Sequence, residues 1–197
     1  YQVIFFRYQD ITPAQHVAFA RQFGTLQVHP LVPHLDDHPE VLVLKSKEDK
    51  RNAANAWHSD VTFSDEPPLG SILLTRKVPE CGDTMWAGMY AAYEALSPAM
   101  KRYLEGMTAL HQAADAQFEK TYEKEDGRGG AARESKKIIP PAERPIIRTH
   151  PETGHKALFV NSIFTQRTVG VTRKESRAIL DFLYDHIATP EFTCRFH

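Results

Sequence analysis

Apolar residues that recur three or four positions apart predict helices along this chain. The clearest follows Thr12, whose hydroxyl and the side chain of Gln15 can form a capping box, with a proline at the first helical position. Apolar residues then repeat at helical spacing as far as Gly24, a residue type that commonly ends a helix. Similar signals predict helices near residues 89–96, from 98 to about 106, and from 172 to about 188.

Short apolar or alternating segments between these helices predict strands. Residues 57–63 alternate apolar and polar side chains, the pattern of a half-buried strand. A turn at residues 150–154 separates two short apolar segments, which predicts a strand–turn–strand unit over 146–160. Further strands are predicted at 1–7, 41–44, 70–78 and 191–197. Short strands with a few helices at one side indicate an α+β domain built around a sheet or sandwich.

Both ends of the chain fall inside predicted strands. Domains seldom begin or stop within a strand, because that leaves backbone groups unpaired at the sheet. We therefore expect residues 1–197 to form a single domain that is truncated at both ends, as the middle of a longer chain.

Residues 114–141 differ from their surroundings. They combine a run of mixed charge with a glycine-rich stretch and two adjacent prolines. Their apolar content is too low to build core, so we interpret them as a mobile surface loop. Such a loop is either a simple linker or a lid over an active site, since long loops in compact domains are often functional.

Composition narrows the classes of partner. The 197 residues include 24 Lys+Arg and 25 Asp+Glu, a formal net charge of −1. Nucleic acids and anionic membranes attract a basic surplus, so neither is an expected partner. No apolar run approaches the length of a membrane span, and no basic segment followed by an apolar stretch opens the chain, so neither a membrane span nor a signal peptide is expected. Cys81 and Cys194 form no C-x-x-C motif, which fits a reducing, cytoplasmic location.

The candidate chemistry lies in the segment around His58 and Asp60. On a strand these two side chains share one face with Thr62, and their Cα atoms lie about 6.5–7 Å apart. An imidazole nitrogen and a carboxylate oxygen at that spacing can converge on one metal ion, and one more ligand completes a facial triad suited to non-haem Fe(II). By itself H-x-D is a weak motif. No nucleophile-elbow, Walker or dinucleotide glycine pattern accompanies it, so hydrolase, NTPase and nicotinamide-dependent functions have little support.

Longer stretches around this pair resemble one family. They include residues 57–63, 67–68, 82–86, 148–151 and 157–161, and they follow one another in the expected order over almost the whole chain. Together they resemble the taurine dioxygenase family of Fe(II)/2-oxoglutarate-dependent oxygenases, which includes aryloxyalkanoate dioxygenases. The resemblance implies a double-stranded β-helix (jelly roll) core with flanking helices. It also implies a dioxygenase that hydroxylates its substrate with O₂ and releases succinate and CO₂ from 2-oxoglutarate.

The resemblance assigns roles to individual residues. His58 and Asp60 match two of the three iron ligands; the third, a His, is expected beyond His197. Thr84 matches the hydroxyl donor to the 2-oxoglutarate carboxylate, and His29 matches a residue that contacts the anionic head of the substrate. The apolar substrate lining is matched by Val61, Phe63 and Phe164. Each position also has an ordinary structural interpretation, as a turn, strand or core residue.

Two departures bear on the substrate. Taurine-specific members have a tyrosine and an asparagine at the positions of Val32 and Ala54. Losing a phenol and an amide weakens recognition of an aminosulfonate. The expected substrate is therefore another small organic anion: an alkylsulfonate, an alkyl sulfate or an aryloxyalkanoate. A homo-oligomer is expected. The alternative is a jelly-roll protein that binds a small anion without redox chemistry.

Overall fold

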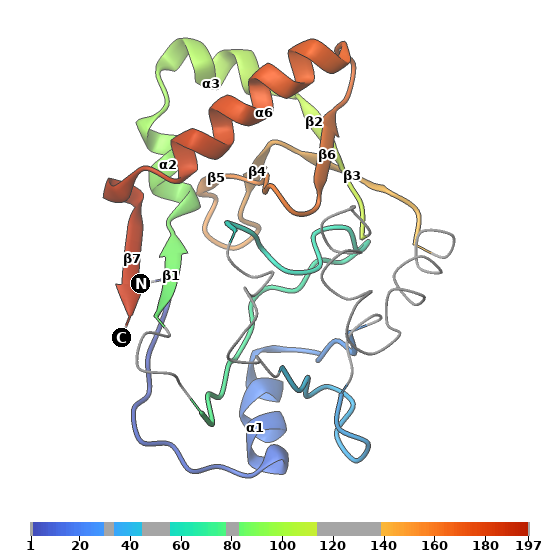
Figure 1. Ribbon diagram of the computed structural model, residues 1–197, viewed down its shortest axis with the longest axis vertical. Helices are drawn as coiled ribbons and strands as arrows, with labels where there is room; N and C mark the ends of the chain where they lie inside the picture. Colours follow the sequence, from blue (N-terminus) through green and yellow to red (C-terminus); the bar gives the residue numbers. More distant parts are fainter. Residues whose placement is uncertain (1, 30–33, 45–55, 78–82, 114–138, 197) are drawn as a thin grey trace. The chain divides into compact units, whose positions relative to one another are not determined.

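The computed structural model describes residues 2–29, 34–44, 56–77, 83–113 and 139–196 (Figure 1). The chain divides into two compact units. The first comprises Tyr1–Asn52 and Pro68–Leu74, and the second comprises Ala53–Pro67 and Thr75–His197. The predicted loop at 114–141 lies outside the described residues except for its last three positions.

The first unit is organised around helix α1 (Pro13–Ala20), which continues into the 3₁₀ turn η1 (Arg21–Phe23). The predicted capping box is present: the Thr12 hydroxyl accepts from the Gln15 backbone N–H, and the Gln15 side chain accepts from the Thr12 N–H. Val17 is buried, and Phe19 makes edge contacts with Phe6 and Phe23. A single bridge pairs His34 with Leu42.

The second unit contains three small antiparallel sheets. In the largest, β2 (Thr108–His111) lies between β3 (Ala142–Pro145) and β6 (Thr165–Thr168). The hairpin of β4 (Ile147–Thr149) and β5 (Lys156–Leu158) forms the second sheet. The third pairs β1 (Thr84–Ala87) with β7 (Thr193–Phe196), which follows the 3₁₀ turn η2 (Pro190–Phe192).

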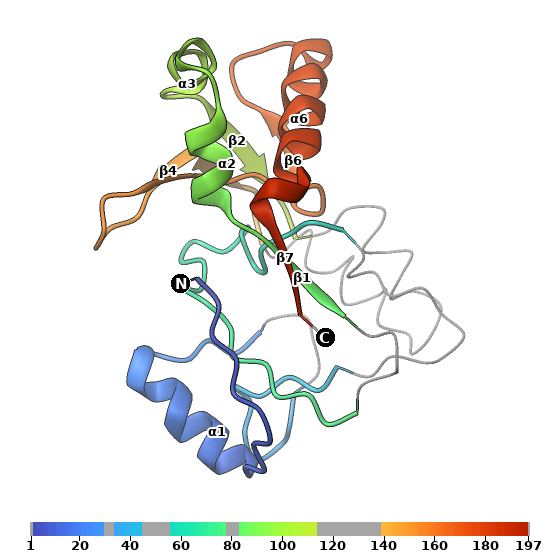
Figure 2. The same ribbon diagram turned by 90° about the vertical axis from the view of Figure 1, so that its left-hand side faces the viewer.

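Three helices enclose the core of this unit: α2 (Met89–Ala95), α3 (Pro98–Leu104) and α6 (Arg173–Ile187). Helix α2 packs on β5 and α6 packs on β6, and the two helices lie side by side (Figure 2). The largest fully buried apolar side chains of this core are Leu104, Ile146, Leu158, Leu183 and Ile187. A second capping box, between Thr172 and Glu175, opens α6 as the sequence predicts. No helix in the described ranges has both the length and the apolarity to cross a membrane.

The predicted helices are confirmed, whereas several predicted strands are wrong. Residues 2–7, 57–63 and 70–77 form no strand, and only one bridge occurs within 41–44. Strands β1, β2, β3 and β6 were not predicted. A helix satisfies its own backbone groups, but a strand forms only where another segment supplies hydrogen bonds, so apolar alternation alone misplaced these strands. The observed class is α+β with antiparallel sheets, and the strands in the described residues form no closed barrel.

Candidate metal centre

His58 and Asp60 are brought together, although not by a strand. His58 lies in an irregular segment, and Asp60 begins a turn that continues to Phe63. The Nε2 atom of His58 lies 3.4 Å from Oδ1 of Asp60. On the other side of the ring, Nδ1 donates a hydrogen bond to the Ala56 carbonyl at 2.7 Å. This bond places the proton on Nδ1 and turns the Nε2 lone pair of the neutral ring toward the carboxylate.

The charge state of His58 depends on this contact. The hydrogen bond with Asp60 is the largest influence and raises the pKa of His58; burial opposes it, and the Ala56 carbonyl adds to the rise. The Asp60 side chain remains 63% exposed. The contact with Asp60 therefore favours the protonated form of His58. Metal binding requires the neutral imidazole and the ionised carboxylate, so a bound cation would compete with that proton.

The two side chains fit a metal ion such as Fe(II). Adjacent ligands at about 2.1 Å from one ion lie about 3 Å from each other, close to the separation of the facing atoms here. A ligating His also typically donates its other ring N–H to a carbonyl or carboxylate, as His58 does to Ala56. No group of three His, Cys, Asp or Glu residues suited to a metal occurs within the described ranges. His58 and Asp60 are thus a pair of candidate ligands, without a third within the described residues.

The segment that carries Asp60 corrects the predicted strand. Val61 has a φ of 56°, in the left-handed region, and the Ser64 N–H donates to the Val61 carbonyl at 3.0 Å. Ser64, which follows this turn, is held by a residue distant in sequence, because Nη2 of Arg144 on β3 donates a hydrogen bond to the Ser64 carbonyl. Val61, Thr62 and Phe63 are all buried, so the predicted alternation of faces is wrong.

Two residues assigned to the substrate lining are in contact. The rings of Phe63 and Phe164 meet edge to face, with centroids 5.2 Å apart and an interplanar angle of 61°. Val61 belongs to the same turn as Phe63 and is 3% exposed. The structure thus gathers three predicted apolar residues beside the Asp60 turn.

The other two predicted site residues lie elsewhere. Thr84 is the exposed first residue of β1 and is paired in register with Phe196 of β7. His29 is half-buried and belongs to the first unit. His58 belongs to the second unit.

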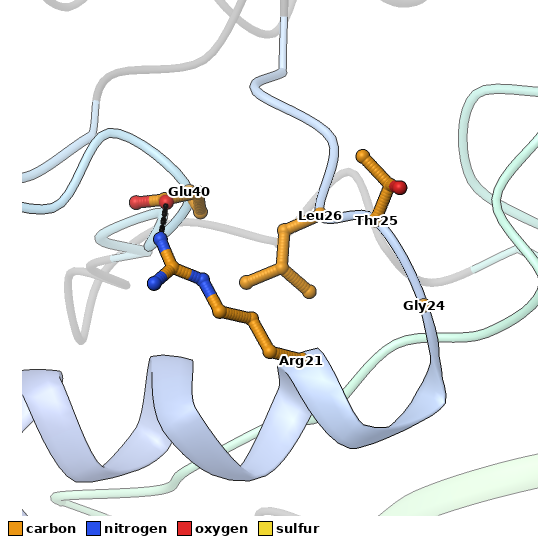
Figure 3. Close-up of a pocket in the computed structure, with 5 residues that line it drawn as sticks. All are labelled: Arg21, Gly24, Thr25, Leu26 and Glu40. Carbon is orange, nitrogen blue, oxygen red and sulfur yellow. Dashed lines mark hydrogen bonds and ion pairs between the residues drawn. The ribbon is translucent and has the colours of Figure 1, made fainter.

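The first unit has an open pocket of its own, with a volume of about 580 Å³ (Figure 3). It is lined by Arg21, Gly24, Thr25, Leu26 and Glu40. The Arg21 guanidinium donates to the Glu40 carboxylate at 3.1 Å, so the positive charge of Arg21 is balanced by Glu40 within the pocket. None of the predicted site residues lines this pocket.

Sequence reasoning did not assign a role to the buried polar residues behind the Asp60 turn. His111 on β2 is completely buried, with Nδ1 2.9 Å from the Thr62 hydroxyl and Nε2 3.4 Å from the Thr165 hydroxyl. Asn161 donates from Nδ2 to the same Thr62 hydroxyl at 3.3 Å. Burial lowers the pKa of His111 to about 4, with a smaller contribution from Arg144, so this ring is neutral. In the sequence, the signal for this buried cluster was a histidine within a short apolar segment.

Comparison with known proteins identifies the family of the chain. Residues 1–197 match the family described as "Taurine catabolism dioxygenase TauD, TfdA family". The chain is 41% identical over 140 residues to a putative alpha-ketoglutarate-dependent sulfonate dioxygenase of Schizosaccharomyces pombe, which covers 71% of this chain and 34% of that protein. It is 33% identical over 201 residues to an alkylsulfatase of Acinetobacter baylyi, covering 99% of this chain and 62% of the relative.

Among solved structures, it is similar to a putative alpha-ketoglutarate-dependent taurine dioxygenase from Burkholderia xenovorans. The TM-score is 0.77 at 35% identity, and the match covers 97% of this chain and 63% of the other. The chain thus spans less than two thirds of the length of each of these relatives. The match over all 197 residues shows that the chain belongs to the TauD/TfdA family.

Proposed function

We propose that the protein containing this chain is an Fe(II)/2-oxoglutarate-dependent dioxygenase that hydroxylates a small organic anion. The observation that carries the proposal is the His58–Asp60 pair. Its facing nitrogen and oxygen lie 3.4 Å apart, and its outer ring nitrogen is tethered to a carbonyl. Family membership supplies the reaction class, which these two side chains fit chemically.

Different residues of the proposed site would bind the metal and the 2-oxoglutarate. Bound Fe(II) would activate O₂ at the expense of 2-oxoglutarate, which leaves as succinate and CO₂. His58 and Asp60 would hold two of its coordination positions, and a His beyond His197 would hold a third. Thr84 would donate a hydrogen bond from its hydroxyl to a 2-oxoglutarate carboxylate, a role that its exposure at the start of β1 allows. The protein orients both substrates and shields the site from water.

The proposed substrate is an alkylsulfonate, an alkyl sulfate or an aryloxyalkanoate. His29 would bind the anionic group, while Val61, Phe63 and Phe164 would contact the organic chain; the edge-to-face pair of phenylalanines offers an apolar surface for it. Hydroxylation of the carbon that bears the sulfonate sulfur, the sulfate oxygen or the ether oxygen would give an unstable product. That product would collapse to an aldehyde and release sulfite, sulfate or a phenol, respectively. Relatives named for sulfonate and alkyl sulfate chemistry support this class. The departures at Val32 and Ala54 lie outside the described residues.

The first test is anaerobic and uses the complete protein in which this chain occurs. Fe(II) and 2-oxoglutarate together are expected to give a weak visible charge-transfer band, because 2-oxoglutarate chelates the metal through two atoms. Asp60→Ala removes a ligand and is expected to abolish the band and substrate-dependent succinate formation. Asp65→Ala, which removes an exposed carboxylate five residues along the same segment, serves as the matched control and leaves both intact.

The outcomes separate the alternatives. A band that survives Asp60→Ala would show that the ligand assignment is wrong. A wild-type protein that binds the anionic substrates but gives neither band nor succinate would instead be the non-redox anion-binding protein. Succinate release measured across sulfonates, sulfates and aryloxyalkanoates then identifies the substrate class.

The remaining proposals concern the whole protein. We propose that the antiparallel sheets belong to a jelly-roll core in one oxygenase domain, supported by the likeness to the Burkholderia structure. We also propose a cytoplasmic homo-oligomer. Light scattering on the purified complete protein tests the assembly, and a mass of one chain would contradict it.

A further inference from the structure

We propose that the buried cluster of Thr62, His111 and Asn161 is a positioning device for the metal centre. Through Thr62 it holds the turn that keeps Asp60 opposite His58. The inference rests on the proposed function, because it gives these residues a task that exists only if His58 and Asp60 bind a metal. None of the three is expected to touch the ion.

The first reason is that the turn holds a conformation its sequence disfavours. Val61 has a φ of 56°, and a β-branched residue rarely adopts the left-handed region. Backbone strain of this kind persists only where surrounding contacts over-determine the conformation. The residues on either side are Asp60, the candidate ligand, and Thr62. The strain is therefore stored immediately beside the ligand.

The second reason is that Thr62 is the point where this turn is anchored to the sheet. Its hydroxyl lies 2.9 Å from Nδ1 of His111 and accepts from Nδ2 of Asn161 at 3.3 Å. Thr62 is 2% exposed and His111 is completely buried, so water does not replace these bonds. In such surroundings a lost hydrogen bond leaves a buried polar atom unsatisfied, which is unfavourable. The cluster therefore opposes relaxation of the strained turn.

The third reason is that Asn161 links two parts of the site. While Nδ2 reaches Thr62, Oδ1 accepts from the backbone N–H groups of Ile163 and Phe164 at 3.1 and 2.8 Å. The same amide thus shapes the turn that places Phe164 against Phe63. One side chain therefore sets both the ligand-bearing turn and an apolar residue of the proposed substrate lining.

A purely structural role would look different. If the cluster only satisfied buried polar groups, its loss would lower stability and leave the metal affinity of the folded protein unchanged. If it positions Asp60, its loss weakens metal binding in protein that is still folded, because the carboxylate then samples orientations away from His58. Partners that orient metal ligands typically change metal affinity by about 10–100-fold.

The test measures Mn(II) binding to the complete protein by electron paramagnetic resonance of the free ion, well below the unfolding temperature of each variant. Thr62→Val keeps the shape of the side chain and removes the hydroxyl; we expect affinity to fall about tenfold. Thr62→Ser restores the hydroxyl and is expected to stay within about twofold of wild type. Thr168→Val is the matched control, because the Thr168 hydroxyl is buried without a hydrogen-bond partner among the described residues.

Each outcome is decisive. Weaker binding in Thr62→Val, with Thr62→Ser and Thr168→Val near wild type, supports the inference. Unchanged affinity in Thr62→Val overturns it and leaves the proposed function standing. If wild-type binding is absent or insensitive to His58→Ala, the proposed function itself fails. Should Thr62→Val not fold, Thr62→Cys keeps a similar volume with a much weaker hydrogen-bonding group, and the same loss of affinity is expected.

Discussion

At the scale of single residues, the site depends on the contact between His58 and Asp60. The spacing of the two residues predicts this contact, but for the wrong structural reason. The two side chains were expected to converge because alternate residues of a strand share a face. They do face each other, but across the start of a turn, with the His58 ring held by the Ala56 carbonyl. Two residues separated by one position are close in almost any extended or turned backbone. Their proximity was therefore predictable, whereas the buried cluster behind them was not.

Strain at Val61 leads to a prediction at the same scale. Val61→Gly removes a buried side chain but relieves a left-handed conformation that glycine adopts freely. Val160 is equally buried, at 4% against 3%, and is not among the residues with positive φ. We expect Val61→Gly to destabilise the fold by about 1–2 kcal/mol less than Val160→Gly, as measured by urea unfolding. Equal losses would show that Val61 carries no strain.

Helices and strands differ in how far local sequence determined them. The capping boxes at Thr12 and Thr172 satisfy backbone groups within a few residues of themselves, so both helices begin where the sequence predicts. Strand β2 has little local signal and exists because β3 and β6 supply hydrogen bonds on both sides. The segment at 70–77 has apolar residues but forms no strand. Strand positions were therefore the least predictable part of the fold.

A pH dependence follows from the buried histidine of β2. Burial and Arg144 on β3 lower the pKa of His111 to about 4, so the unfolded chain takes up a proton on this residue between pH 6.5 and 4 while the folded chain does not. The free energy of unfolding is expected to fall as pH decreases through this window, by on the order of 3 kcal/mol. Below about pH 4 the contribution no longer changes.

The measurement compares urea unfolding of the wild type with His111→Gln, which has no titrating group at this position. The difference in unfolding free energy between the two proteins should change between pH 6.5 and 4 and stay constant above pH 7. A difference that is independent of pH would show that His111 is accessible to protons in the folded state.

At the scale of the whole molecule, the two units differ in how much core they contain. Among the described residues, Val17 is the buried residue of the first unit, whereas the core cluster lies in the second. Amides in regions with few buried apolar contacts exchange through local opening. We expect hydrogen exchange to be slowest in β2, β6 and α6, and much faster in α1. Equal protection of α1 and α6 would contradict this difference.

The sequence by itself determined the helix starts, the candidate ligand pair, the α+β class and the resemblance to an oxygenase family. These depend on residues that are near one another along the chain or on residue identities alone. Only the tertiary structure decided which segments pair as strands, that the Asp60 segment is a strained turn, and that Thr62, His111 and Asn161 meet behind it. In this cluster, Thr62 is 49 positions from His111 and 99 positions from Asn161 along the chain. Such contacts are selected by packing and by satisfaction of buried polar groups, which no local pattern encodes.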